Sequence, residues 1–148
     1  PALVNKGMSC LVANKTVTTK NKNKINSLFL KVGKTHWLSK EKDMNIVTAI
    51  SGSGPGYIFL LVDAFEKAAL KLGLNKKDSK KLVYQTFFGS LELLLKNNNS
   101  ALRLAQNIAV RGGTTEAAFR VFLDKKILHK TFERAINAAY KKSIKLSK

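Results

Sequence analysis

Apolar residues recur along the chain at two different spacings, and the change between them falls near residue 43. Residues 3–13 are mostly apolar, with small and β-branched side chains, and predict a strand with an irregular start. Further on, the i, i+3, i+4, i+7 spacing of a helix is met by Ile25, Leu28, Phe29 and Val32. Gly33 ends this helix, and residues 35–38 predict a second strand. Because two parallel strands leave both sheet edges unpaired, we expect residues 1–42 to be the end of a larger α/β domain.

From Asp43 onward the pattern predicts helices only. The first long helix spans residues 57–72, and the next opens with an Asn75 cap and runs to about Lys96. Three more helices are expected at residues 100–108, 115–125 and 130–145. The core-facing residues predicted for the Asn75-capped helix include Leu82, Phe87, Leu91, Leu94 and Leu95. On the last helix they are Phe132, Ile136, Ala139, Tyr140 and Ile144.

Two of these helices, at residues 57–72 and 82–96, are apolar over more than one face. A helix of this kind has to be buried on several sides. Residues 43–148 alone offer few elements that could cover them. We therefore expect a dimer in which helices of the two chains interlock.

Charge and composition narrow the possible functions. The net charge of +18 is almost all lysine, scattered along the chain. Dedicated nucleic-acid readers combine charge with arginine forks or aromatic platforms, so specific nucleic-acid binding is disfavoured. The longest strongly apolar run, residues 57–62, is shorter than the roughly 18 residues of a membrane span, and we expect a soluble, cytoplasmic protein. One cysteine, Cys10, and two separated histidines, His36 and His129, predict neither a disulfide nor a metal site.

Gly112, Gly113, Thr114 and Thr115 stand between two predicted helices. Paired glycines let a ligand approach the backbone closely, and the following helix start offers free N–H groups and the positive end of its dipole. Such a place suits a carboxylate or a phosphate. The same residues also make an ordinary turn and cap, so the pattern by itself leaves both interpretations open. Glu116 is explained by favourable charge in a first helical turn.

A second glycine-rich segment joins two apolar helical segments and consists of Ser51, Gly52, Ser53, Gly54 and Pro55. Its spacing is neither that of a Gly-x-Gly-x-x-Gly dinucleotide turn nor that of a Walker A loop. We therefore favour a kinked joint between helices over a phosphate-binding loop.

Five segments together carry a family resemblance over nearly the whole chain. Residues 1–13 and 32–38 come first, followed by residues 47–57, which read Val-Thr-Ala-Ile-Ser-Gly-Ser-Gly-Pro-Gly-Tyr. The Lys-Leu-Gly-Leu of residues 71–74 and the Gly-Gly-Thr-Thr of residues 112–115 complete the order. This order and spacing resemble the carboxy-terminal part of the pyrroline-5-carboxylate reductase family.

The resemblance implies a mainly α fold. Residues 43–148 would form a helical dimerisation domain like the carboxy-terminal domain of 6-phosphogluconate dehydrogenase, and residues 1–42 a β-α-β remnant of a Rossmann domain. The family reaction is the NAD(P)H-dependent reduction of 1-pyrroline-5-carboxylate, a small imino acid, to L-proline in proline biosynthesis. The expected assembly is a homodimer or a higher oligomer of dimers.

Site residues are also implied by the resemblance. Gly112, Gly113 and Thr114 would bind the substrate carboxylate through backbone groups, and the hydroxyl of Thr115, as the catalytic residue, would hydrogen-bond the ring nitrogen. Such a reductase needs little acid–base equipment, because positioning and the cofactor carry most of the chemistry.

The chain departs from the family pattern at two places. Val110 and Arg111 stand where the family usually has Ser-Pro, and Gly56 replaces a usual alanine. Arg111 either holds the substrate carboxylate directly or is a surface or ion-paired arginine.

The glycine fingerprint and the ribose-reading acid of a dinucleotide fold do not occur in these 148 residues, so no cofactor site is expected in this chain. We therefore expect a truncated or decayed product, a fragment, or one half of a split enzyme, inactive in isolation. The alternatives are a non-catalytic helical dimerisation module left after enzyme decay and a basic nucleic-acid-associated protein.

Overall fold

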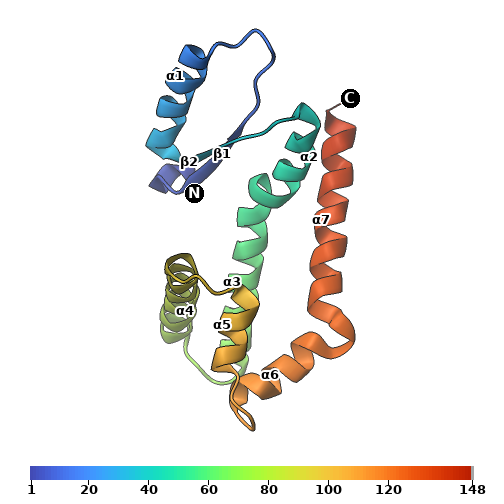
Figure 1. Ribbon diagram of the computed structural model, residues 1–148. Helices are drawn as coiled ribbons and strands as arrows, with labels where there is room; N and C mark the ends of the chain where they lie inside the picture. The colour runs from blue at the N-terminus through green and yellow to red at the C-terminus, as the bar shows by residue number, and fades with distance from the viewer. Residues whose placement is uncertain (148) are drawn as a thin grey trace. The chain divides into compact units, whose positions relative to one another are not determined.

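A computed structural model describes residues 1–147, which are mostly helical and include one two-stranded parallel sheet (Figure 1). The chain forms two compact units. One comprises Pro1–Gly56 with Arg134–Lys148, and the other comprises Tyr57–Glu133. The expected division into an α/β remnant, residues 1–42, and a helical domain, residues 43–148, stays a prediction.

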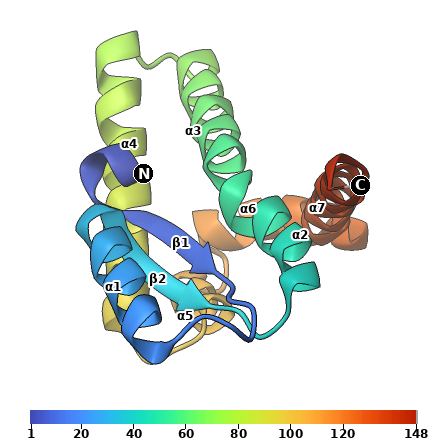
Figure 2. The ribbon, with the colours of Figure 1, turned by 90° about the horizontal axis from the view of Figure 1, so that it is seen from above.

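The first unit begins with the expected strand–helix–strand arrangement (Figure 2). Strand β1, Gly7–Leu11, pairs in parallel with β2, Gly33–Trp37, and helix α1, Thr19–Phe29, connects them. The irregular start expected before β1 is a 3-10 turn at Ala2–Val4. Thr18 caps α1, because its hydroxyl accepts the Asn21 backbone N–H at 3.2 Å.

One amide side chain ties α1 to the sheet. Oδ1 of Asn26 accepts hydrogen bonds from the Thr35 hydroxyl at 2.6 Å and from the Trp37 indole N–H at 3.3 Å. The apolar stripe of α1 stays exposed in this unit, at Ile25 by 40% and at Leu28 by 57%. A stripe of that kind requires a covering surface that these elements do not provide.

The glycine-rich joint is helical rather than a loop. Helix α2, Met44–Val47, passes into a π-helical turn, Thr48–Gly52, and then into α3, Gly54–Lys71. The wider turn is marked by the bond from the Ser53 N–H to the Thr48 carbonyl at 2.8 Å. Ala49 of this turn is one of the few fully buried apolar residues.

The carboxy-terminal half of α7, Ile127–Leu146, packs beside α2 in the first unit. Its contact is partly polar, since the Ser143 hydroxyl donates to Oδ1 of Asn45 at 2.7 Å. The predicted face of this helix is confirmed as half-buried throughout: Phe132, Ile136, Ala139, Tyr140 and Ile144.

By length and composition alone, the helical stretch Glu41–Lys71 is apolar enough to cross a membrane. No uninterrupted apolar run in the sequence is as long as a membrane span. The mean hydropathy over 18 residues of this stretch is nevertheless as high as that of a membrane helix. Only 6% of that window is buried within the chain. The stretch therefore needs a covering surface, and one such helix is weak evidence for a membrane.

A helical hairpin opens the second unit (Figure 2). Helix α3 ends in a Schellman turn, in which Gly73 adopts a φ of 102° and the Leu74 N–H bonds to the Ala69 carbonyl at 3.1 Å. Asn75 then caps α4, Lys76–Lys96, by accepting the Asp78 N–H at 2.9 Å. Both helix boundaries follow the sequence prediction.

The hairpin closes on a narrow face of α4. Phe65 and Phe87 meet edge to face with ring centroids 5.2 Å apart, and the buried Ser79 hydroxyl donates to the Glu66 carbonyl at 3.2 Å. Val83 is only 6% exposed. The predicted core stripe was therefore wrong at three residues, which this hairpin leaves 49–80% exposed: Leu82, Leu91 and Leu95.

Three further helices follow as expected. Ser100 caps α5, Ala101–Ile108, by accepting the Arg103 N–H. Helix α6, Thr114–Leu123, ends two residues before the predicted boundary. Its end is fixed by Lys125, which takes a positive φ of 45° in the 3-10 turn before α7.

Gly33 and Gly7 are partners in the parallel strand pair, and Gly33 has no room for a side chain. A Cβ on Gly33 would lie 2.0 Å from the Gly7 carbonyl oxygen, and the φ of Gly33 is 150°. We predict that Gly33→Ala destabilises the β1–α1–β2 arrangement by about 2 kcal/mol or more, because strain and a backbone clash combine. Fluorescence of Trp37, the only tryptophan, during denaturant unfolding measures this.

Gly56→Ala is the matched control for that substitution. No atom lies within 4 Å of a Cβ added there, and the residue is helical. We expect this variant to gain roughly 0.5–1 kcal/mol from the helix propensity of alanine. Equal unfolding midpoints for the two variants would contradict the proposed constraint at Gly33.

Candidate functional site

The loop between α5 and α6 turns tightly on two glycines. Gly112 has a φ of +75°, a conformation that favours glycine. The N–H of Gly113 donates to the Val110 carbonyl at 3.0 Å, which closes the turn. A Cβ on Gly113 would lie 2.8 Å from Cγ2 of Val110, whereas one on Gly112 would meet nothing within 4 Å. Both glycines are thus required, Gly112 for its φ and Gly113 for close packing.

Helix α6 begins directly after this turn, with Gly113 as its cap residue. Glycine has no side chain with which to accept the first helical N–H groups. The bond from the Ala117 N–H to the Gly113 carbonyl, at 3.2 Å, opens the intrahelical ladder. The N–H groups of Thr114, Thr115 and Glu116 precede it and are the donors that a helix start leaves without an intrahelical acceptor. Together with the helix dipole they make a place suited to an anion.

The side chains around this helix start are available for a ligand. Thr115 is half-buried, and Thr114 is exposed. Within residues 1–147, neither threonine hydroxyl makes a hydrogen bond. Arg111 is exposed and has no ion pair or hydrogen bond with a described residue. The structure therefore brings together the five residues predicted from sequence for substrate binding.

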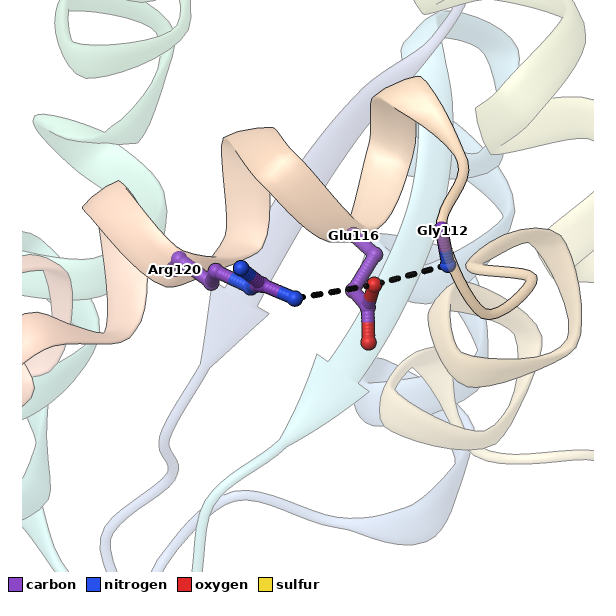
Figure 3. A network of polar contacts seen from close by, with 3 residues as sticks. All are labelled: Gly112, Glu116 and Arg120. Carbon is purple, nitrogen blue, oxygen red and sulfur yellow. Dashed lines mark hydrogen bonds and ion pairs between the residues drawn. The ribbon is translucent and has the colours of Figure 1, made fainter.

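A polar network that links the loop to the first two turns of α6 was not predicted from sequence (Figure 3). Oε2 of Glu116 accepts the Gly112 backbone N–H at 2.9 Å and a guanidinium N–H of Arg120 at 3.3 Å. Figure 3 shows the carboxylate lying between the loop backbone and the arginine. Glu116 is the third residue of α6, a position from which a carboxylate can reach back to the preceding backbone. This position is the sequence feature from which the network could have been predicted.

The glycine-rich joint is a separate structure in the first unit. Gly52 lies in the π-helical turn, and Gly54 and Pro55 begin α3. No atom lies within 4 Å of a Cβ added to Gly54. The joint therefore owes its shape to the wide helical turn rather than to a positive φ.

The described residues do not fit a nicotinamide dinucleotide or a metal. A dinucleotide turn needs glycines between a strand and the helix that follows it. Residues 12–18, which connect β1 to α1, contain none. In residues 1–147, no group of three or more His, Cys, Asp and Glu side chains is placed to hold a metal ion.

The fold and the loop together define a class of protein. Helices whose apolar faces stay open within one chain are typical of a dimerisation domain. Residues 41–146 match the family model for pyrroline-5-carboxylate reductase dimerisation. The chain belongs to the pyrroline-5-carboxylate reductase family.

Individual relatives agree with this assignment. The chain is 38% identical to a pyrroline-5-carboxylate reductase of Haemophilus influenzae and 36% identical to one of Pseudomonas aeruginosa, covering 97% and 99% of this chain. These matches cover 53% and 54% of the two relatives. The chain thus spans about half the length of the curated relatives that it matches.

Solved structures show the same fold. A Plasmodium falciparum pyrroline carboxylate reductase with NADP bound has a TM-score of 0.90 and 38% identity, over 97% of this chain and 58% of that one. A Coxiella burnetii pyrroline-5-carboxylate reductase has a TM-score of 0.90 and 39% identity, over 98% and 53%. The expected mainly α fold, with a small parallel sheet before a helical dimerisation domain, is confirmed. The apolar stretch Glu41–Lys71 lies within the span of the dimerisation match, which is consistent with a soluble protein.

Proposed function

We propose that this protein acts in the reduction of 1-pyrroline-5-carboxylate to L-proline, as a dimer whose α5–α6 loop binds the imino acid. The observation that carries the proposal is the start of α6, where a glycine turn presents free N–H groups beside two unpaired threonine hydroxyls. Reduced nicotinamide cofactor is the proposed hydride donor. The β1–α1 turn does not fit that cofactor, so no residue of this chain is assigned to it.

The substrate carboxylate is proposed to bind at the N-terminus of α6. The N–H groups of Thr114 and Thr115 point along the helix axis and donate to it, and the dipole adds to the attraction. Gly112 and Gly113 allow the close approach. The exposed guanidinium of Arg111 adds a charge-assisted hydrogen bond, because it has no partner within the described residues.

The hydroxyl of Thr115 is proposed to face the ring nitrogen of the substrate. It is half-buried and forms no other hydrogen bond within residues 1–147. A neutral hydroxyl can donate to or accept from that nitrogen, so it orients the imine bond without removing a proton.

The Val110–Arg111 replacement is compatible with this loop. In the family pattern a proline would stiffen the turn before the glycines. Here the Val110 carbonyl accepts the Gly113 N–H at 3.0 Å, and the valine side chain packs where a residue-113 side chain would lie. Backbone pairing and packing thus keep the turn closed without the proline.

The dimer proposal rests on apolar surface. Among the described residues, the only buried apolar side chains are Ala49 and Val83. Large apolar side chains remain exposed along α3 and α4, namely Ile58, Phe59, Leu60, Phe65, Leu70, Leu82, Tyr84, Phe88, Leu91, Leu93 and Leu95. Each is worth about 1.5–3 kcal/mol when fully buried, so together they rival the ~5–15 kcal/mol stability of a whole domain.

A groove in the second unit adds to this surface. It encloses about 280 Å³ between α4 and α5, and its lining is almost wholly apolar: Ser90, Leu91, Leu93, Leu94, Ala101, Leu104, Ala105 and Ile108. The groove lies inside the span that matches the dimerisation model. A second copy of the chain is therefore the proposed occupant of these faces.

The alternative function is that of a non-catalytic dimerisation module. A module of that kind would dimerise without binding imino acids. Binding of the product therefore discriminates between the two functions.

We predict that the chain binds L-proline saturably and that Thr115→Val weakens this binding about tenfold or more, because a hydrogen bond to the ring nitrogen is lost. Isothermal titration calorimetry measures both affinities. Thr131→Val, on the exposed face of α7, is the matched control and should leave the affinity unchanged. Absence of saturable binding in the unmodified chain would favour the non-catalytic module.

For the dimer, we predict that Phe59→Lys combined with Leu60→Lys shifts the chain from dimer to monomer or unfolds it. These side chains are 68% and 69% exposed in one chain, and burying two charges in their place costs several kcal/mol. Sedimentation equilibrium measures the mass. Leu3→Lys, at a fully exposed residue outside the matched span, is the control that should remain dimeric. A double variant as dimeric as this control would argue against the assigned surface.

A further inference from the structure

We infer that Glu116 is the positioning residue of the substrate loop, an inference that rests on the proposed function. Its carboxylate holds the backbone of Gly112 and thereby fixes the turn from which α6 presents its N–H groups. The residue would not itself touch the substrate. Its effect on binding would pass through the loop.

Glu116 lies three residues after the cap of α6. With Gly113 as the cap, Glu116 is the third helical residue, from which an acidic side chain ordinarily reaches back to the N–H of the cap. Here the Gly113 N–H already donates to the Val110 carbonyl. The carboxylate therefore takes the N–H of Gly112, one residue earlier, at 2.9 Å.

This bond falls on the residue that most needs a restraint. Gly112 has a φ of +75°, and no atom lies within 4 Å of a Cβ added there, so packing does not hold it. Glycine also has the largest backbone freedom to lose. The hydrogen bond and the side-chain contact with Val110 restrain Gly113. The bond from Glu116 restrains Gly112, the other glycine of the turn.

Arg120 completes the arrangement from the following helical turn. Its guanidinium donates to the same Oε2 at 3.3 Å, from the side of the carboxylate opposite to the loop backbone (Figure 3). An unpaired carboxylate so close to the helix start would repel a substrate carboxylate. Pairing Glu116 with Gly112 and Arg120 offsets part of that repulsion.

The test uses the full 148-residue chain and two readouts. Selective ¹⁵N-glycine labelling gives nine amide signals, among which hydrogen exchange of the Gly112 amide reports the loop bond directly. Titration calorimetry with L-proline reports binding. Glu116→Ala removes the acceptor, whereas Glu116→Gln keeps an acceptor oxygen and removes the charge.

We expect Glu116→Ala to speed exchange of the Gly112 amide and to weaken L-proline binding about tenfold, with Glu116→Gln restoring both toward the unmodified chain. Arg120→Ala should change either readout less, because its ion pair is exposed. Rescue by glutamine is the discriminating result, since a carboxylate that only stabilised the helix dipole would not be replaced by an amide.

Either of two results overturns the inference while leaving the proposed function standing. One is Gly112 exchange in Glu116→Ala that equals that of the unmodified chain. The other is Glu116→Gln that binds L-proline as weakly as Glu116→Ala. If the unmodified chain binds no L-proline while Gly112 exchange still depends on Glu116, the proposed function fails and Glu116 is a helix-start residue only.

Discussion

The constraint on which the rest of this structure depends is apolar surface that one chain cannot bury. Helices α3 and α4 meet at the Phe65–Phe87 ring contact and at the hydrogen bond from Ser79 to Glu66, and large apolar side chains of both helices stay exposed. Exposure of this surface to water is unfavourable. A second chain that associates with it would bury it and thereby stabilise both chains. The same exposed apolar surface explains why Glu41–Lys71 is apolar enough for a membrane helix, although these residues lie within the part of the chain that matches the dimerisation model.

The shape of the candidate site depends on backbone hydrogen bonds rather than on buried apolar surface. Two glycines and the Val110 carbonyl form the turn, and Glu116 restrains it from the helix that follows. The groups offered to a ligand are then mainly N–H donors and hydroxyls. In the proposed function, these groups orient an anionic substrate without a catalytic dyad, which suits a reaction whose chemistry a cofactor supplies.

Local signals in the sequence were sufficient for most helix boundaries. Asn75 and Ser100 are caps and Gly73 ends α3, because these features depend on neighbours within a few residues. The glycine turn before α6 was likewise expected from its glycines and threonines, whereas its role as a substrate loop stays a prediction.

Features set by long-range packing were not predictable in the same way. The stripe on α4 was wrong at Leu82, Leu91 and Leu95, because periodicity identifies an apolar face without identifying what covers it. Glu116 was interpreted as dipole charge alone, since its bond to Gly112 depends on a turn whose conformation the sequence only suggests. The π-helical form of the Thr48–Gly52 segment also had no local signature beyond its glycines.

The most direct test of the central claim is whether folding of this chain depends on its concentration. Denaturant unfolding followed by helical circular dichroism would be measured over a roughly hundredfold range of protein concentration. If the apolar faces of α3 and α4 are buried only between two chains, the unfolding midpoint rises with concentration, because folding and association are one equilibrium. A cooperative transition with a concentration-independent midpoint, at the mass of a single 16.4 kDa chain, would contradict the account.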